Sequence, residues 1–117
     1  MAGLTTHVLD TSKGKPAAKL KIQLFKINKL EKFLIGTFLT NEDGRVEGPL
    51  ISGENLEEVN YELLFFAGEY LKKEYINLDQ NLFLDQIPIR FNITNKFEHY
   101  HVPLLLSAFG YSTYRGS

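Results

Sequence analysis

The sequence contains no cysteine among its 117 residues. A chain without cysteine has no disulfide framework, no thiolate nucleophile and no cysteine-bound zinc. Its fold must therefore be held together by a hydrophobic core alone. A reducing compartment is compatible with this composition but is not required by it.

Long apolar runs and an excess of one charge are also missing. No apolar run approaches the roughly 18 residues of a membrane helix, and Met1-Ala2-Gly3 leads into a strand-like segment rather than a signal peptide. Lys and Arg (13) nearly balance Asp and Glu (14), which argues against the basic surface of a nucleic-acid-binding protein. We therefore expect a cytoplasmic protein with no nucleic acid and no membrane among its partners.

Alternation with a period of two residues recurs along the chain. Leu20, Ile22 and Leu24 point to one side of a predicted strand, and the polar residues between them point to the other. Many short strands separated by turn residues indicate an all-β sandwich or barrel of antiparallel sheets, and the length fits a single domain, residues 1–117. The spacing predicts one helix over 68–75 and a loop over 77–86. The other predicted strands are residues 4–10, 33–40, 48–51, 61–66, 87–94, 100–106 and 110–114.

The segment 100–106 is apolar on both of its faces. Val102, Leu104 and Leu106 form one apolar set, and the residues between them are largely apolar too. A sandwich strand has only one core face, so the second face needs a cover, since a contiguous apolar patch is unfavourable in water. Either a second subunit in a symmetric oligomer or a loop of the same chain would serve.

The three histidines, His7, His99 and His101, are candidates for proton transfer near neutral pH. His7 could equally be a hydrogen-bonded strand histidine with a structural role. His99 and His101 lie on one side of their strand, so they could chelate a metal. A catalytic zinc would need a third protein ligand, which no local spacing identifies, and we predict no metal site.

Arg45 follows the Asp43–Gly44 turn, where an arginine is either a solvated charge or a planar fork for an anionic or carbonyl-bearing ligand. The hydroxyls of Ser112, Thr113 and Ser117 could suggest a nucleophile. However, no Gly-x-Ser-x-Gly elbow or ordered triad accompanies them.

Four blocks of sequence occur in order along the chain. They are Leu4-Thr5-Thr6-His7-Val8-Leu9-Asp10 with Gly14 and Pro16, the Asp43-Gly44-Arg45 turn, the run His99-Tyr100-His101-Val102-Pro103-Leu104-Leu105-Leu106-Ser107, and the ending Tyr111-Ser112-Thr113-Tyr114-Arg115-Gly116-Ser117. Together they resemble the 5-hydroxyisourate hydrolases of the transthyretin-related family. Residues 52–96 match this family only loosely, and Ala108 stands where it commonly has proline, which affects the local turn.

The resemblance implies a transthyretin-like (prealbumin-like) sandwich of two four-stranded antiparallel sheets with one short helix. It also implies a homotetramer with active sites at a subunit interface. The implied reaction is the opening of the 5-hydroxyisourate ring by water, a step of purine degradation between urate and allantoin. Neither an organic cofactor nor an obligatory metal is implied.

The resemblance assigns catalysis to His7, Arg45 and His101, with either imidazole as the base. The residues that it assigns to substrate binding are His7, Arg45, Tyr114, Arg115, Gly116 and Ser117. Two rival interpretations remain, a transthyretin-like carrier of a small ligand and an adhesion-type sandwich. Transthyretin itself lacks the histidine pattern seen at His7 and His101, so the sequence looks like the enzyme branch.

Overall fold

A computed structural model describes residues 2–75 and 82–116, and within them the chain is almost entirely β-structure with one short α-helix. This confirms the predicted fold class. The elements are β1 (Gly3–Thr5), β2 (Val8–Asp10), β3 (Lys15–Pro16), β4 (Lys21–Asn28), β5 (Glu31–Leu39), β6 (Ile51–Ser52), the 3-10 turn η1 (Gly53–Asn55), β7 (Asn60–Phe66), α1 (Ala67–Glu74), β8 (Gln86–Asn92), β9 (His99–His101), β10 (Leu104–Leu106) and β11 (Tyr111–Thr113).

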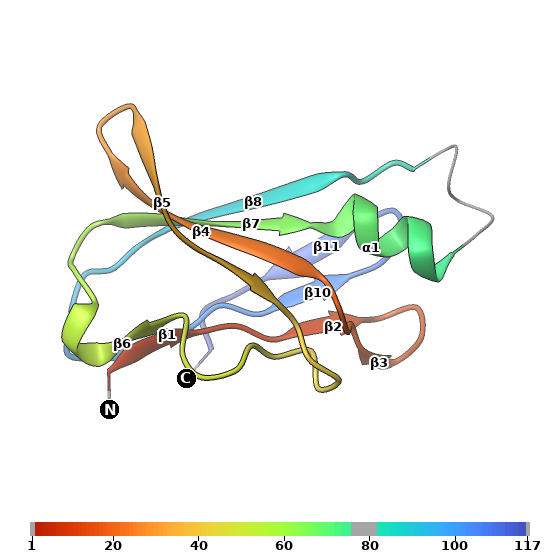
Figure 1. The fold of residues 1–117 in the computed structure, drawn as a ribbon, viewed down its shortest axis with the longest axis horizontal. Helices are drawn as coiled ribbons and strands as arrows, with labels where there is room; N and C mark the ends of the chain where they lie inside the picture. The colour runs from red at the N-terminus through yellow and green to blue at the C-terminus, as the bar shows by residue number, and fades with distance from the viewer. Residues whose placement is uncertain (1, 76–81, 117) are drawn as a thin grey trace.

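The first sheet contains β5, β4, β7 and β8 in that order, and each of these pairings is antiparallel (Figure 1). The predicted alternation is confirmed in β4, where Ile22 and Leu24 are buried in the core and the residues beside them are partly exposed. In β7, Leu63 and Phe65 are likewise fully buried. The two central strands, β4 and β7, thus turn an apolar face toward the core between the two layers.

The second layer consists of two short sheets that continue into each other. Their strand orders are β6-β1-β9 and β11-β10-β2-β3. Between them, the N–H of Val102 donates to the carbonyl of Thr5 (2.9 Å) and the N–H of Leu104 donates to the carbonyl of His7 (2.9 Å). Pro103, which has no N–H to donate, stands at this interruption. β1 with β2, and β9 with β10, therefore behave as two long strands that are broken in the middle.

These two long strands run parallel, whereas the sequence predicts antiparallel pairs. The reason lies in the connection between them. A parallel pair needs a crossover connection, and here the chain builds the whole first sheet and α1 before it returns beside its first strand. Residues close to opposite ends of the sequence are brought side by side in this way.

Asp10 fastens α1 and the chain after it to the end of β2. Its carboxylate is almost fully buried and accepts hydrogen bonds from the hydroxyls of Tyr70 (2.7 Å) and Tyr75 (2.8 Å). The backbone N–H groups of Ser12 and Lys13 donate to the same carboxylate. Burial and the hydrogen bond to Asp10 raise the pKa of Tyr70, and they raise the pKa of Tyr75 to about 12. Both tyrosines thus remain protonated donors.

Most element boundaries lie within a few residues of their predicted positions. The helix is shifted by one residue, and the strand predicted over 48–51 is the shorter β6. Of the loop predicted over 77–86, residues 77–81 lie outside the described part, 82–85 are irregular, and Gln86 begins β8. No helix in the described ranges is long and apolar enough to cross a membrane.

Candidate active site

The outer face of the parallel strand pair carries all three histidines. Along the first long strand, Thr6 and Val8 are buried in the core while Thr5 and His7 are only half-buried on the opposite face. The same alternation in β9 buries Tyr100 and leaves the two flanking histidines on the outer face. The parallel register places Thr5 beside His101. One surface therefore collects imidazoles from both strands.

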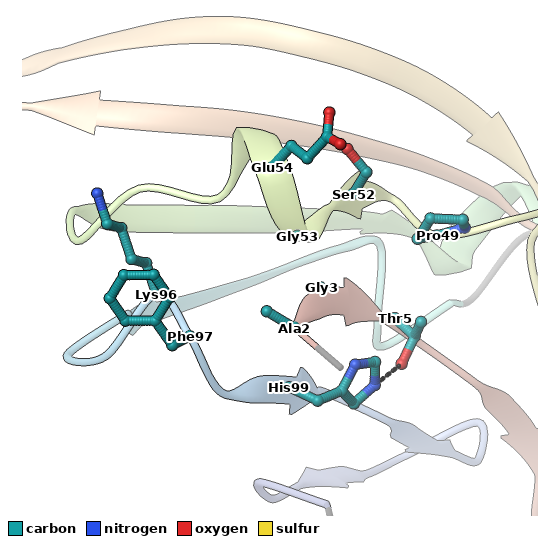
Figure 2. A pocket seen from close by; sticks show the side chains of 10 residues that line it. All are labelled: Ala2, Gly3, Thr5, Pro49, Ser52, Gly53, Glu54, Lys96, Phe97 and His99. Atoms are coloured by element: carbon teal, nitrogen blue, oxygen red, sulfur yellow. Dashed lines mark hydrogen bonds between the residues drawn. The ribbon is translucent and has the colours of Figure 1, made fainter.

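Thr5 links two of these imidazoles directly. Its hydroxyl lies 2.8 Å from Nδ1 of His101 and 2.9 Å from Nε2 of His99. Figure 2 shows the second of these contacts, with the imidazole of His99 beside Gly3 and Thr5. The sequence predicted no role for Thr5 in the site. The alternation could have indicated it, because residues 5 and 7 of a strand share a face.

The turn that carries Arg45 is held tightly against the first strand. The side-chain oxygen of Asn41 accepts hydrogen bonds from the N–H groups of Asp43 (2.9 Å) and Arg45 (3.1 Å). The carbonyl of Gly44 accepts from the N–H of Val8 (2.8 Å). Gly44 has a φ of +74°, and a Cβ at this position would lie 2.4 Å from the carbonyl oxygen of Val8. Only glycine fits here, and it brings the following arginine next to His7.

The carboxyl-terminal segment approaches His101 from the other side. The N–H of Gly116 donates to the carbonyl of His101 (2.7 Å) in an isolated antiparallel bridge. A Cβ on Gly116 would lie 2.8 Å from Cδ2 of the His101 ring, so no side chain fits between them. The backbone of Gly116 therefore lies directly against the ring of His101, whereas its assignment to substrate binding stays a prediction.

The next residues of this segment differ in position. The guanidinium of Arg115 lies 4.0 Å from the ring centre of Tyr100, on the face opposite to the histidines, and donates to Glu98 (3.1 Å) and to the carbonyl of His99 (3.2 Å). Tyr114 is 57% exposed. Ser117 lies outside the described residues. Of the tail residues that the structure describes, Gly116 lies against a predicted catalytic side chain, that of His101.

The electrostatics of this surface favour neutral imidazoles. Burial lowers the pKa of His7, and the nearby Arg45 lowers it further, while the backbone and carboxylate of Asp43 partly oppose this. Burial also lowers the pKa of His101, with additional contributions from Arg45, His7 and His99. The positive charge of Arg45 thus acts on both predicted catalytic imidazoles. At neutral pH they are unprotonated and able to accept a proton.

Thr5 lines two hollows, and His99 lines the larger of them. A small cavity of about 70 Å³ lies between Thr5, Thr6 and the segment from Arg45 to Leu50, with room for water. A groove of about 960 Å³ lies at the end of the sandwich near η1, as Figure 2 shows. The groove is lined by Ala2, Gly3, Thr5, Pro49, Ser52, Gly53, Glu54, Lys96, Phe97 and His99.

Among the described residues, no group of three histidine, aspartate or glutamate side chains is placed to hold a metal ion. The hydroxyl of Thr113, one of the candidate nucleophiles, donates to the carbonyl of Pro103 (2.7 Å). The arrangement instead offers neutral imidazoles for proton transfer beside a guanidinium for developing negative charge. This combination suits the attack of water on a carbonyl group.

Comparisons with known proteins agree with this chemistry. The family model described as the HIUase/Transthyretin family matches residues 4–116. The chain is 52% identical to 5-hydroxyisourate hydrolase 2 of Rhizobium meliloti (strain 1021), over 97% of this chain and 95% of that protein. It is also similar to the structure of Klebsiella pneumoniae 5-hydroxyisourate hydrolase, with a TM-score of 0.80 and 28% identity over 99% of this chain and 100% of that one. The crystal structure of (S)-allantoin synthase has a TM-score of 0.91 and 48% identity over 99% of this chain, which spans 44% of that chain.

Proposed function

The chain belongs to the HIUase/Transthyretin family, and on this premise we propose that it hydrolyses 5-hydroxyisourate at the surface formed by His7, Arg45 and His101. The observation that carries the proposal is the shared environment of these residues. A Cβ on Gly44, the residue before Arg45, would lie 3.3 Å from the His7 ring, and the charge of Arg45 lowers the pKa of both imidazoles, which supports one site for the three groups. The 52% identity to a hydrolase favours catalysis over the carrier alternative.

The reaction needs a water molecule, a base and a donor for the oxyanion. A neutral imidazole, of His101 or His7, takes a proton from water as the water oxygen bonds to the ring carbonyl carbon. The carbon–nitrogen bond then breaks, and the ring nitrogen receives a proton from the imidazolium. The product of opening a cyclic amide in this way is a carboxylic acid, which ionises at neutral pH.

Arg45 stabilises the negative charge that forms on the attacked oxygen. Its guanidinium offers donors in a planar fork that matches a planar, carbonyl-rich substrate better than the point charge of lysine does. Arg45 is exposed and forms no salt bridge within residues 2–75 and 82–116. Its donors are therefore free for a ligand.

The tail closes the cleft in our proposal. Gly116 packs against His101 and fixes the orientation of its ring. Tyr114 offers a flat, exposed ring to the substrate, and Ser117 contributes its hydroxyl. The assignment of Arg115 to substrate binding stays a prediction. Its stacking on Tyr100 provides a second role, because it holds the tail in place.

We further propose a cytoplasmic homotetramer in which a second subunit covers the histidine surface. In a single chain, His7, His101 and Leu105 are only half-buried and Arg45 is exposed. A covering subunit would exclude bulk water and strengthen the interaction of Arg45 with the oxyanion. Light scattering at micromolar concentration should give the mass of four chains, and a persistent monomer would contradict this part of the proposal.

The direct test is to add the purified protein to freshly prepared 5-hydroxyisourate and to follow the ultraviolet absorbance. We expect the decay to be accelerated over buffer in proportion to the protein concentration. Decay at the buffer rate would refute the hydrolase assignment. Tight binding of the compound without turnover would favour a carrier.

A further inference from the structure

The hydroxyl of Thr5 stands between two imidazoles and has a single proton to give. It contacts Nδ1 of His101 at 2.8 Å and Nε2 of His99 at 2.9 Å. A hydroxyl that bonds to two ring nitrogens donates to one and accepts from the other. The proton positions on the two rings are therefore coupled. When one ring accepts from Thr5, the other must donate to it.

We propose that Thr5 and His99 are positioning residues that set the tautomer of His101 and carry a proton between the catalytic surface and the groove beside His99. This proposal rests on the proposed hydrolase function. It assigns a role to two residues that the catalytic scheme above does not use. We call the hydrogen-bonded series His101–Thr5–His99 the coupled chain. It uses Nδ1 of His101 and leaves Nε2 free, since Nε2 bonds to no residue in the described part of the protein.

The coupled chain has two states. In the first, Nδ1 of His101 donates to Thr5, Thr5 donates to Nε2 of His99, and Nε2 of His101 holds a free lone pair for a base. In the second, Nε2 of His99 donates to Thr5, Thr5 donates to Nδ1 of His101, and Nε2 of His101 carries a proton. Because Nε2 of His101 is a base in the first state and only a hydrogen-bond donor in the second, the direction of the Thr5 hydroxyl decides which role His101 fills.

The change from the first state to the second moves one proton across the chain. Nε2 of His101 takes a proton from the cleft, Nδ1 passes its own proton to Thr5, and Thr5 passes its proton to Nε2 of His99. His99 then releases its Nδ1 proton to water, and each residue ends uncharged. Hydrolysis of an amide to an ionised carboxylic acid releases one proton per turnover, and this path gives that proton an exit. The first state returns when both rings change tautomer by proton exchange with water and the Thr5 hydroxyl turns back.

The groove provides the outlet. His99 lines it, and the position that a side chain on Gly3 would occupy is 3.7 Å from Nδ1 of His99. The absence of a side chain on Gly3 leaves that edge of the imidazole uncovered, as Figure 2 shows. Glu54 and Lys96 are the charged residues that line the same groove.

Other charged groups act on the two ends of the chain. Arg45 and His7 face His101, together with His99 itself. At the other end, the guanidinium of Arg115 bonds to the backbone carbonyl of His99 rather than to its ring.

The first experiment compares Thr5→Val with Thr5→Ser. Valine keeps the shape of threonine without the hydroxyl, and serine keeps the hydroxyl. We expect Thr5→Val to lower kcat about 5- to 10-fold with KM within about twofold, the equivalent of one hydrogen bond, and Thr5→Ser to restore most of kcat. Equal kcat in all three proteins would overturn the proposal. Equal losses in the valine and serine variants would show that Thr5 acts only through packing, and would overturn it as well.

The second experiment compares His99→Gln with His99→Leu. Glutamine can still donate to or accept from Thr5 but cannot pass a proton on, whereas leucine can do neither. We expect His99→Gln to lower kcat with KM within about twofold, because only the proton path is lost. His99→Leu should lose kcat at least to the same extent as Thr5→Val. Wild-type kcat in His99→Gln would overturn the proton path.

A spectroscopic measurement separates this proposal from the hydrolase assignment. Nitrogen-15 spectra of histidine-labelled protein report which ring nitrogen of His101 carries the proton, whether or not the enzyme turns over. We expect one dominant tautomer in the wild type and a mixture in Thr5→Val. The same mixture in both proteins would refute the coupling even if the wild type hydrolyses 5-hydroxyisourate. An inactive wild type with one dominant tautomer would instead refute only the function.

Discussion

His7 and Asp10 stand three residues apart in the first long strand, yet their surroundings are opposite in kind. Asp10 is 1% exposed and accepts hydrogen bonds from two tyrosine hydroxyls and two backbone N–H groups. His7 is half-buried, and its pKa is lowered by burial and by a neighbouring positive charge. A buried polar group with all its partners supplied stabilises a fold. One that is partly open and electrostatically perturbed is suited to chemistry.

A single sequence motif can thus contain both structural and functional residues. Alternation alone separates the two residues, because His7 faces outward and Asp10 faces the core. The block from Leu4 to Asp10 therefore contributes His7 to the site and Asp10 to the joint between β2 and α1. Variants of the two clusters should fail in different ways.

The largest effect is expected for His101→Gln. Glutamine cannot accept the proton of the attacking water, so kcat/KM should fall by about 10²- to 10⁴-fold. The free energy of unfolding should change by less than about 1 kcal/mol, because the ring is only half-buried. Steady-state kinetics and urea denaturation of the same preparation measure both quantities. A large loss of stability would place His101 with the structural cluster.

Asp10→Ala should show the reverse pattern. It leaves two tyrosine hydroxyls and two N–H groups without their acceptor, and the free energy of unfolding should fall by about 3–5 kcal/mol. The folded fraction should keep its kcat. If this variant does not fold, Tyr75→Phe removes a single donor and should cost about 1 kcal/mol with kcat unchanged. A stable but inactive Asp10→Ala protein would erase the distinction between the clusters.

Arg45→Lys tests the guanidinium of the site at constant charge. Because lysine lacks the planar fork, turnover should fall about 10- to 100-fold. Arg90→Lys is the matched control, since Arg90 pairs with Glu62 on the first sheet and has no predicted catalytic role. Its turnover should equal that of the wild type. Unchanged turnover in Arg45→Lys would remove Arg45 from the mechanism.

The smallest effect concerns pH. Burial and Arg45 lower the pKa values of His7 and His101, so both imidazoles stay neutral to a pH below the ordinary value of 6.5. Activity should hold above the lowered pKa values and be lost as the pH falls through them. Arg45→Gln removes the positive charge, and both pKa values should then rise. Proton spectra of the imidazole ring hydrogens during a pH titration would measure the shift, and identical titrations would show that the charge does not reach the rings.

Much of the fold follows from local pattern, because a two-residue period directly reports which side chains face a core. The burial of Ile22 and Leu24 and the shared face of His99 and His101 are of this kind. The parallel pairing of the two long strands could not be predicted from local pattern, since it depends on which distant segments become neighbours in the sheet. The partners of Asp10 are likewise beyond local pattern, because Tyr70 and Tyr75 reach it from the end of the other layer.

The site divides in the same way. His7 and His101 could be nominated as scarce titratable residues, and Arg45 through its place in a resembling block. Alternation places Thr5 on the same face as His7, but its position between two imidazoles could not be predicted, because it depends on the register between β1 and β9. The side of the sheet on which Arg115 lies follows from pairing too. Gly116 stands opposite His101, so the residue before it belongs to the other face.

The parallel pairing also fixes the order of events during synthesis. Thr5 and His101 are separated by 96 positions in the chain, and every residue between them must be made before they can meet. One edge of the first long strand therefore stays unpaired until residues 99–106 have been made. Contacts of such long separation close slowly and leave strand edges open in the meantime. Catalytic competence should consequently be one of the last properties that the newborn chain acquires.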